Sequence, residues 1–523
     1  MPAPPTFAEL ALELCVLIFL GLDFRSLVTC RQVSQCFKDI IDGSVALRYK
    51  LALSAADMED RPGNVLIIRK RLRRLRRYVS AWRDLRFRPI IQLPPIPGGV
   101  FHWRLSGCVL ARMGPVTSAG TRDIFFNKLP GYFRKIRHMQ WYIADIGCDA
   151  VDFAIDPAQN LLILIELRDE FVKIYVKTMS SCRDHPAAAS PLLQFLSPLG
   201  RAKMSPIDHP ILILGNHLGI LMHAYAPGST ESESHLVIWD WKTSEVVMWL
   251  YAPDESLESF AFLGEHYVLL GARVDHSPTL MVYDMSSSLT TKTMFRHVEC
   301  ATTFRYPASN QEVGWIRLHS QPGLDWSPGA LVKPPFGPAQ SDGLLAVDIH
   351  FFEDGIPGYT FAHLIPCHVL LSRMQPGVAW DWHQWAPSGT CMHDDFGLIT
   401  GPLPCGGYRY VRRSNSPDWC DGDIEIQLCD FSRYQRHLRL TTADEEDGEN
   451  YMERVHSAKW PTGQGMQKLQ TVLQYTSKAI TLRAAQTGII GDIETVACLS
   501  EDNLVVVQPS HDGNDVQFHL LTL

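Results

Sequence analysis

The sequence predicts a mainly β chain with a helical N-terminus, in which the β part folds as a propeller. Two stretches, residues 7–50 and 65–87, carry apolar residues at helical spacing. From Val100 onward the pattern changes to short runs of β-branched and aromatic residues separated by turn residues. Several of these runs repeat one strand–turn–strand phrase, and at about 40 to 60 residues per blade they would make roughly seven or eight blades. Paired β-sandwiches are the alternative architecture.

The N-terminal stretch predicts short amphipathic helices. In residues 9–22 an apolar stripe recurs every four positions with Phe19 beside it, and consists of Leu10, Leu14, Ile18 and Leu22. A second stripe at spacings of three and four consists of Leu27, Cys30, Val33, Phe37 and Ile41. Helices of this length cannot form a stable unit alone, and an ordinary helical subdomain that packs on its own chain would show the same periodicity.

The order of residues in this stretch resembles an N-terminal F-box. The family motif is matched by Leu10, Glu13, Leu14, Ile18, Phe19, Leu22, Leu27, Val33, Ser34 and Phe37. Two positions depart, since Ala11 stands where the family has Pro and Ser26 where it has Asp. The tail at residues 42–51 is similar to the continuation found in fungal F-box proteins. The resemblance covers under a tenth of the chain.

The resemblance implies that residues 1–60 are a helical F-box domain that binds a Skp-type adaptor and, through it, a cullin assembly. The implied adaptor-binding residues are Leu10, Leu14, Ile18, Phe19, Leu22, Leu27, Val33 and Phe37. Some of them must line the domain's own core, and the sequence does not divide the two sets. We expect Leu14 and Phe19 to project into the adaptor interface.

Residues 61–95 read as a basic helical linker. Between Arg61 and Arg88 there are eleven Lys or Arg residues and a single acid, Asp84. A solvated helix face that spaces the F-box from the next domain accounts for this charge; a nuclear address or an acidic partner is the alternative. The Pro- and Gly-rich segment 94–99 then ends the helix, so we expect residues 96–523 to form a propeller-like domain. The resemblance implies that this domain binds the substrate.

Composition restricts the function. A net charge of -8 does not suggest a nucleic-acid partner, and no run reaches the ~18 apolar residues that a membrane span needs. Acids precede the early apolar run where a signal peptide would be basic, and the thirteen cysteines are scattered without metal-binding spacing. We therefore expect reduced thiols, no cofactor, no metal and a cytoplasmic protein, with a nuclear location as the second option.

The β region offers a series of strand candidates. They are residues 161–167, 172–178, 211–214, 236–241, 246–251, 267–270, 280–283, 344–349, 424–429, 479–482, 504–508 and 516–521. Three phrases, which begin at Asp152, Ser259 and Glu494, share the order strand, turn, strand, polar turn, strand. The segment ending in Trp239 and Asp240 looks like the third-strand end of a WD repeat. A propeller must also close, and we expect the C-terminal strand at 516–523 to pair with residues 100–105 or 108–113.

Candidate sites for chemistry are weak. The first group is His393, Asp394 and Asp395, as metal ligands or an acid/base pair, and the second is Asp421, Asp423 and Glu425. Polar turns between strands explain both groups without chemistry. The aromatic run 380–385 is either a binding anchor at the propeller rim or, as we favour, buried between blades. Residues 229–234, 334–341 and 444–450 read as polar surface loops.

The resemblance to an F-box implies a non-catalytic substrate-recognition subunit of a Skp-cullin-F-box ubiquitin ligase. The target protein is not identified by the sequence. A propeller scaffold that binds proteins without a ligase is the alternative. A propeller enzyme such as a glycosidase is a third possibility, which would need convergent carboxylates in the central pocket.

Overall fold

A computed structural model describes most of the chain. The described residues are 10–523 except 62–63, 169–170, 198–200, 205–210, 226–231, 255, 276, 288, 321–333, 340–342, 354–355, 395–404, 414–422, 433–454, 463–464, 488, 490–494 and 510–514. Asp395, Asp421 and the acidic stretch 444–450 lie outside this set.

Polar residues cap the starts of three of the N-terminal helices. The first four are α1 (Leu12–Gly21), α2 (Phe24–Val33), α3 (Gln35–Gly43) and α4 (Val45–Ala55), and α5 (Ile68–Arg83) follows. The Asp23 carboxylate accepts a hydrogen bond from the Ser26 backbone at 2.9 Å at the start of α2, and Ser34 and Ser44 cap α3 and α4 in the same way. Each short polar break in the sequence is therefore a helix start.

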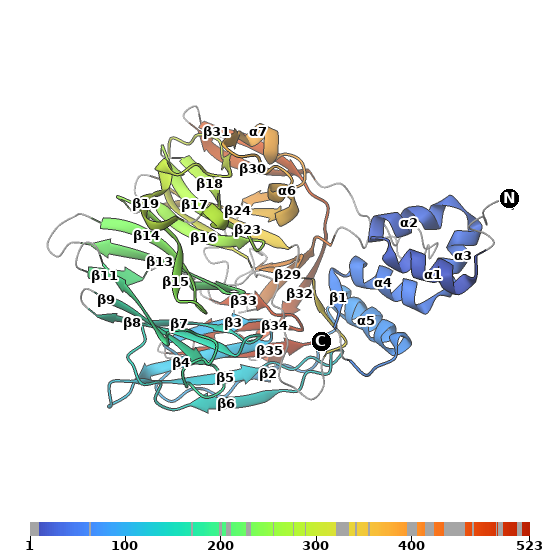
Figure 1. Cartoon of the computed structure of the whole chain (residues 1–523), viewed down its shortest axis with the longest axis horizontal. Helices are drawn as coiled ribbons and strands as arrows, with labels where there is room; N and C mark the ends of the chain where they lie inside the picture. Colours follow the sequence, from blue (N-terminus) through green and yellow to red (C-terminus); the bar gives the residue numbers. More distant parts are fainter. Residues whose placement is uncertain are drawn as a thin grey trace.

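The β region forms seven sheets that follow one another around a ring (Figure 1). Blade 1 has β3 (His102–Ser106), β4 (Val109–Val116), β5 (Arg122–Lys128) and β6 (Met139–Ile143), and blade 2 has β7 (Asp152–Asp156), β8 (Leu161–Arg168), β9 (Phe171–Thr178) and β10 (Leu192–Leu196). Blade 3 has β11 (Arg201–Met204), β12 (Ile211–Leu214), β13 (His217–Tyr225), β14 (Ser232–Asp240), β15 (Glu245–Ala252) and β19 (Leu289–Met294). Blade 4 has β16 (Leu257–Leu263), β17 (Tyr267–Val274), β18 (Ser277–Asp284), β20 (Thr302–Arg305) and β25 (Val378–Trp380).

The remaining blades contain the later part of the chain and one early strand. Blade 5 has β21 (Glu312–His319), β23 (Leu344–Glu353), β24 (Ile356–Pro366) and β26 (Cys391–Asp394), and blade 6 has β27 (Cys405–Gly406), β28 (Arg409–Arg413), β29 (Ile424–Asp430) and β32 (Thr476–Leu482). Blade 7 has β33 (Val496–Leu499), β34 (Asn503–Pro509), β35 (Val516–Thr522) and β2 (Ile91–Gln92). Two further pairs are β1 (Met58–Asp60) with β22 (Phe336–Pro338), and the hairpin of β30 (Val455–Thr462) and β31 (Gly465–Val472). Short helices α6 (Cys367–Leu371), α7 (Trp382–Trp385) and α9 (Ala484–Thr487) join strands of blades 4 to 7.

An apolar core fills the space between every two neighbouring blades, including blades 7 and 1. The chain is therefore a seven-bladed β-propeller with a helical N-terminus, which confirms the predicted fold class and excludes paired sandwiches. The predicted strands are also confirmed, and the three repeated phrases are the first three strands of blades 2, 4 and 7. Trp239 and Asp240 end β14, the third strand of the meander in blade 3, and the Asp240 carboxylate accepts two backbone N–H groups of the turn that follows.

The ring closes through strands from both ends of the propeller, but the predicted partner of the C-terminal strand is wrong. β35 pairs with β34 and, on its other edge, with β2, where Ile91 faces Leu520 and Gln92 faces His519. Residues 100–105 and 108–113 instead lie in β3 and β4 of blade 1. The strand that completes blade 7 thus comes from before residue 96.

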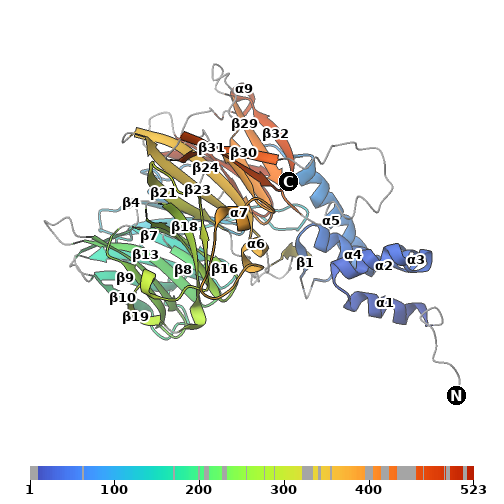
Figure 2. The same ribbon diagram turned by 90° about the horizontal axis from the view of Figure 1, so that it is seen from above.

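The helical part is docked on the propeller and lies beside one side of the ring (Figures 1 and 2). Leu72, Leu75, Tyr78 and Trp82 of α5 are buried against the apolar residues of blades 6 and 7. The interpretation of residues 61–95 as a solvated spacer is therefore wrong for this face of α5. None of the helices formed by described residues is long and apolar enough to cross a membrane.

Two predicted surface loops are in part buried strands. Phe336 is fully buried in β22, which pairs with β1, although its neighbours Pro334, Pro335 and Pro338 suggested a loop. Residues 232–234 belong to β14. Ser234 is buried, and its hydroxyl donates to the Asp254 carbonyl at 2.8 Å.

Candidate protein-interaction surface

Helix α1 is apolar on both of its faces. Cys15 and Phe19 point inward, each only 2% exposed. On the opposite face Leu14, Leu17 and Ile18 are 49%, 64% and 47% exposed, and their spacing of three and four positions places them side by side. We call these three residues the α1 apolar surface; Leu12, at the helix start, is exposed as well. Exposed apolar side chains that lie together on one helix face are a candidate surface for contact with another protein.

A compact core holds α1 in place. It contains Phe19, Phe24, Leu27, Ile41, Leu47, Leu51 and Ala55 from all four helices. The Phe19 and Phe37 rings pack edge to face with centroids 5.4 Å apart, and the Lys50 ammonium donates to the Leu20 carbonyl at 2.5 Å. The Arg31 guanidinium binds the Asp42 carboxylate through two hydrogen bonds of 2.7 and 3.0 Å, which joins α2 to α3. The α1 apolar surface is thus presented by a fixed helix.

The eight residues that the resemblance implies as adaptor-binding differ in their exposure to solvent. Leu14, Ile18 and Val33 are exposed; Leu10, Leu22 and Phe37 are half-buried; Phe19 and Leu27 are buried in the core of the helical unit. The expectation that Phe19 projects into an interface is therefore wrong, because its ring packs against α3. Sequence reasoning missed Leu17, which could have been found three positions after Leu14 on the same face.

The solvent-facing side of α5 carries a basic surface. It consists of the exposed residues Arg69, Lys70, Arg73, Arg76 and Arg77. Arg83 and Arg86 are paired with Asp84, and Arg71 contacts Asp60 at 2.7 Å. Partial burial opposes ionisation of Asp84, but hydrogen bonds from Arg86, Arg83 and Ser80 outweigh it and lower the pKa of this carboxyl to about 2.

The aromatic run 380–385 is a packing element, as favoured from the sequence. Trp382 and Trp385 are 9% and 0% exposed, in the core between blades 4 and 5. The Asp381 carboxylate and the Gln384 side chain form a reciprocal cap at the start of α7, which fixes both tryptophans. These rings are therefore unavailable as rim anchors.

Two of the carboxylates singled out in the sequence accept backbone hydrogen bonds from distant segments of the chain. The Asp394 carboxylate accepts the Lys459 backbone N–H at 3.0 Å, and Asp423 accepts that of Ala484 at 2.8 Å. Glu425 lies in β29. His393 differs from them, because it meets Cys391 and His456 in a cluster that the sequence analysis did not identify.

A small cavity lies where the helices meet the propeller. Its volume is about 60 Å³, and Tyr78, Trp82, Arg409 and Glu501 are among the residues that line it. The Arg409 guanidinium lies 4.8 Å from the centre of the Trp82 ring. Since ligand pockets usually measure ~300 Å³ or more, this cavity has room for about two water molecules only.

Comparison with known proteins identifies no family for this chain. No protein-family model matches the sequence, and no curated protein is similar to it. Among solved structures, the WD40 domain of Toxoplasma gondii coronin is 9% identical, with 83% of this chain and 87% of that chain covered and a TM-score of 0.32. The Dos1 propeller is 12% identical, with 83% and 95% covered and a TM-score of 0.34. The Nup133 propeller of Vanderwaltozyma polyspora is 8% identical, with 83% and 97% covered and a TM-score of 0.32.

Proposed function

We propose that this protein is the substrate-recognition subunit of a Skp-cullin-F-box ubiquitin ligase. In this proposal the α1 apolar surface binds a Skp-type adaptor and the propeller binds the target protein. The observation that carries the proposal is the exposure of Leu14, Leu17 and Ile18 on a helix whose other face is fully packed. Leu14 and Ile18 are also positions at which the sequence resembles an F-box.

The arrangement of the helical unit and the propeller is suited to a protein that tethers a target to a ligase. The helical unit has its own core, and α5 packs against blades 6 and 7, so the adaptor-binding face and the propeller would keep a fixed relation. A receptor that holds a target near the ubiquitin-charged enzyme raises its effective concentration without performing chemistry itself. The propeller supplies the second binding surface in this proposal.

Binding to a purified Skp-type adaptor tests the proposal. We expect the full-length chain to co-elute with the adaptor in size-exclusion chromatography. The double variant Leu14→Asp with Ile18→Asp should lose this binding at least about a hundredfold, because both carboxylates would be buried unpaired in the interface. Both side chains are about half exposed, so the variant should stay folded by circular dichroism.

The matched control is Leu196→Asp, which changes an equally exposed leucine, 56% accessible, on β10 of blade 2. It should bind the adaptor like the wild type. Wild-type chain that fails to bind the adaptor, or a folded double variant that binds it normally, would refute the proposal. Target proteins can then be identified by affinity purification and mass spectrometry, with the double variant as the reference.

A further inference from the structure

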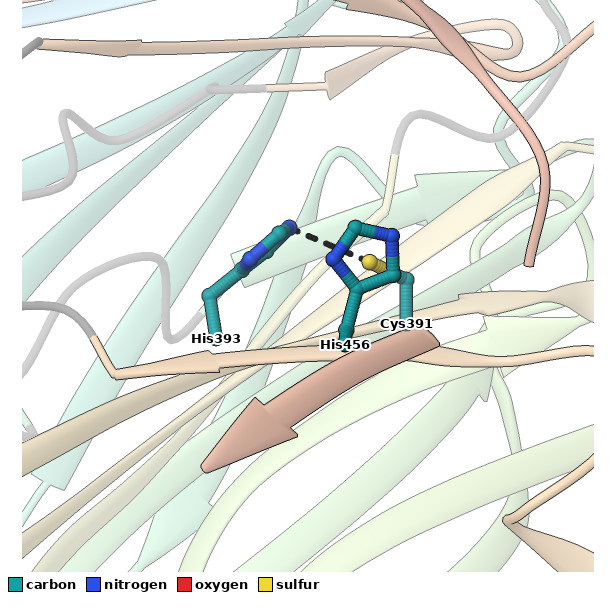
Figure 3. Close-up of side chains that lie close together, drawn as sticks. All are labelled: Cys391, His393 and His456. Atoms are coloured by element: carbon teal, nitrogen blue, oxygen red, sulfur yellow. Dashed lines mark hydrogen bonds between the residues drawn. The ribbon is translucent and has the colours of Figure 1, made fainter. Parts of the chain in front are cut away.

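Three metal-binding side chains converge beside the outer strand of blade 5 (Figure 3). Cys391 and His393 lie two positions apart on β26, so they point to the same face of the strand. His456 joins them from β30 of the neighbouring hairpin. One donor atom of each residue lies within 4.8 Å of the other two, and the Cys391 Sγ is 3.1 Å from the His393 Nε2.

The donor set has the chemistry of a zinc site. One thiolate and two imidazoles are ligands that Zn²⁺ prefers, and three protein ligands leave a fourth tetrahedral position for water. With Zn–S near 2.3 Å and Zn–N near 2.0 Å, neighbouring donors of such a site lie about 3.3 to 3.6 Å apart. The observed separations span this range, from 3.1 Å between the Cys391 Sγ and the His393 Nε2 to at most 4.8 Å for any pair.

The strands that carry the ligands are held together independently of any ion. The Met392 N–H donates to the Thr471 hydroxyl of β31 at 2.9 Å, and the Lys459 N–H of β30 donates to the Asp394 carboxylate at 3.0 Å. The His456 ring stacks on that of Tyr475, with centroids 5.2 Å apart. A site with fixed strands and an oriented ring loses little freedom when an ion binds.

Binding of an ion is coupled to loss of a proton. A thiolate, not a thiol, coordinates Zn²⁺, so the Cys391 thiol must lose its proton when an ion binds. This proton is released to solvent as the Zn–S bond forms.

We propose that Cys391, His393 and His456 bind one Zn²⁺ ion, which fastens the β30–β31 hairpin to blade 5. The ion would join two chain segments that are distant in sequence, and its fourth position would stay open to water. The competing explanation is a thiol–imidazole hydrogen bond inside a packed core. The proposal does not depend on adaptor binding and survives if the ligase role is wrong.

Metal titration of the purified full-length chain tests the site. After treatment with a chelator, we expect the chain to take up one equivalent of Zn²⁺, to release protons and to unfold at a higher temperature. With Co²⁺ in place of Zn²⁺, a thiolate-to-metal charge-transfer absorption should appear. Cys391→Ala and His456→Gln should each reduce the affinity at least about a hundredfold.

The matched control is Cys405→Ala, which removes another buried thiol of the same inter-blade core. It should keep the stoichiometry and the cobalt spectrum of the wild type. Wild-type chain that binds no Zn²⁺ tightly, or whose Co²⁺ adduct lacks the thiolate absorption, overturns the proposal. If Cys391→Ala does not fold, His456→Gln decides, because it changes the ligand on the other chain segment; an unchanged Zn²⁺ affinity of the folded variant refutes the site.

Discussion

The Arg134 guanidinium donates through Nε to the Asp502 carboxylate at 2.7 Å, although the two residues are 368 positions apart. Both side chains are 1% exposed. Arg134 follows β5 of blade 1 and Asp502 lies in the turn between β33 and β34 of blade 7, so the pair joins the first blade to the last. Burial disfavours the charge of Arg134, but Asp502 and Glu501 more than offset this and raise its pKa. The ion pair therefore links the first and the last blade, where the ring closes.

We predict that Arg134→Met lowers the free energy of unfolding by about 3 to 5 kcal/mol, because it leaves a buried carboxylate without its partner. Denaturation in urea measures this effect. The control Asp184→Asn removes an exposed ion pair with Lys177 and should cost at most about 1 kcal/mol. Equal effects of the two variants would show that Arg134 does not hold the ring closed.

Removal of residues 516–523 should open the ring. β34 would lose a whole ladder partner and β2 its only partner among the described strands, and the cores that contain Leu520 and Leu521 would be exposed. We expect a lower midpoint of thermal unfolding and aggregation in light scattering. A truncated chain that stays monomeric with an unchanged midpoint would contradict closure through β35.

The blades were predictable because each contains strands of five or more residues with turn residues between them. The closing strand was not, since Ile91–Gln92 is two residues long and precedes prolines, and only its contact with β35 makes it a strand. Phe336 in β22 was missed for the same reason. Short strands that depend on tertiary contacts carry no periodic pattern.

The candidate sites show the same limit. The apolar spacing of α1 located the helix, but apolar residues on both faces do not reveal which face is buried; the packing of Phe37 against Phe19 decides it. Likewise, Cys391 and His456 lie in different strands with no local metal-binding spacing, and only the fold brings them together. The sequence therefore predicted the helices and strands better than the residues of the candidate sites.

Alanine substitutions on the two faces of α1 should differ in their effect on stability. Phe19→Ala should destabilise the helical unit by about 3 to 5 kcal/mol, because it leaves a cavity among α1, α3 and α4. Leu17→Ala, at a side chain that is 64% exposed, should change stability by about 0.5 kcal/mol at most. Hydrogen exchange across residues 12–55 measures the difference, and similar exchange in both variants would mean that the assignment of faces is wrong.

The imidazole of His363 is enclosed by the rings of Tyr306, Trp382 and Trp385. The Tyr306 hydroxyl and the His363 Nδ1 share a hydrogen bond of 2.8 Å. Burial lowers the pKa of His363 from 6.5 to about 3. Between these values the unfolded chain binds a proton at this residue and the folded chain does not.

The folded state should therefore lose stability as the pH falls below 6.5, and His363 alone should contribute about 2 kcal/mol of this loss between pH 7 and pH 5. Urea denaturation at both pH values measures the slope. His363→Gln can still accept the Tyr306 hydrogen bond, and it should be less stable at pH 7 yet lose correspondingly less on acidification. His383→Gln, which changes an exposed histidine of α7, should keep the wild-type slope. If the His363→Gln slope equals that of the wild type, His363 is not the buried neutral histidine that this contact requires.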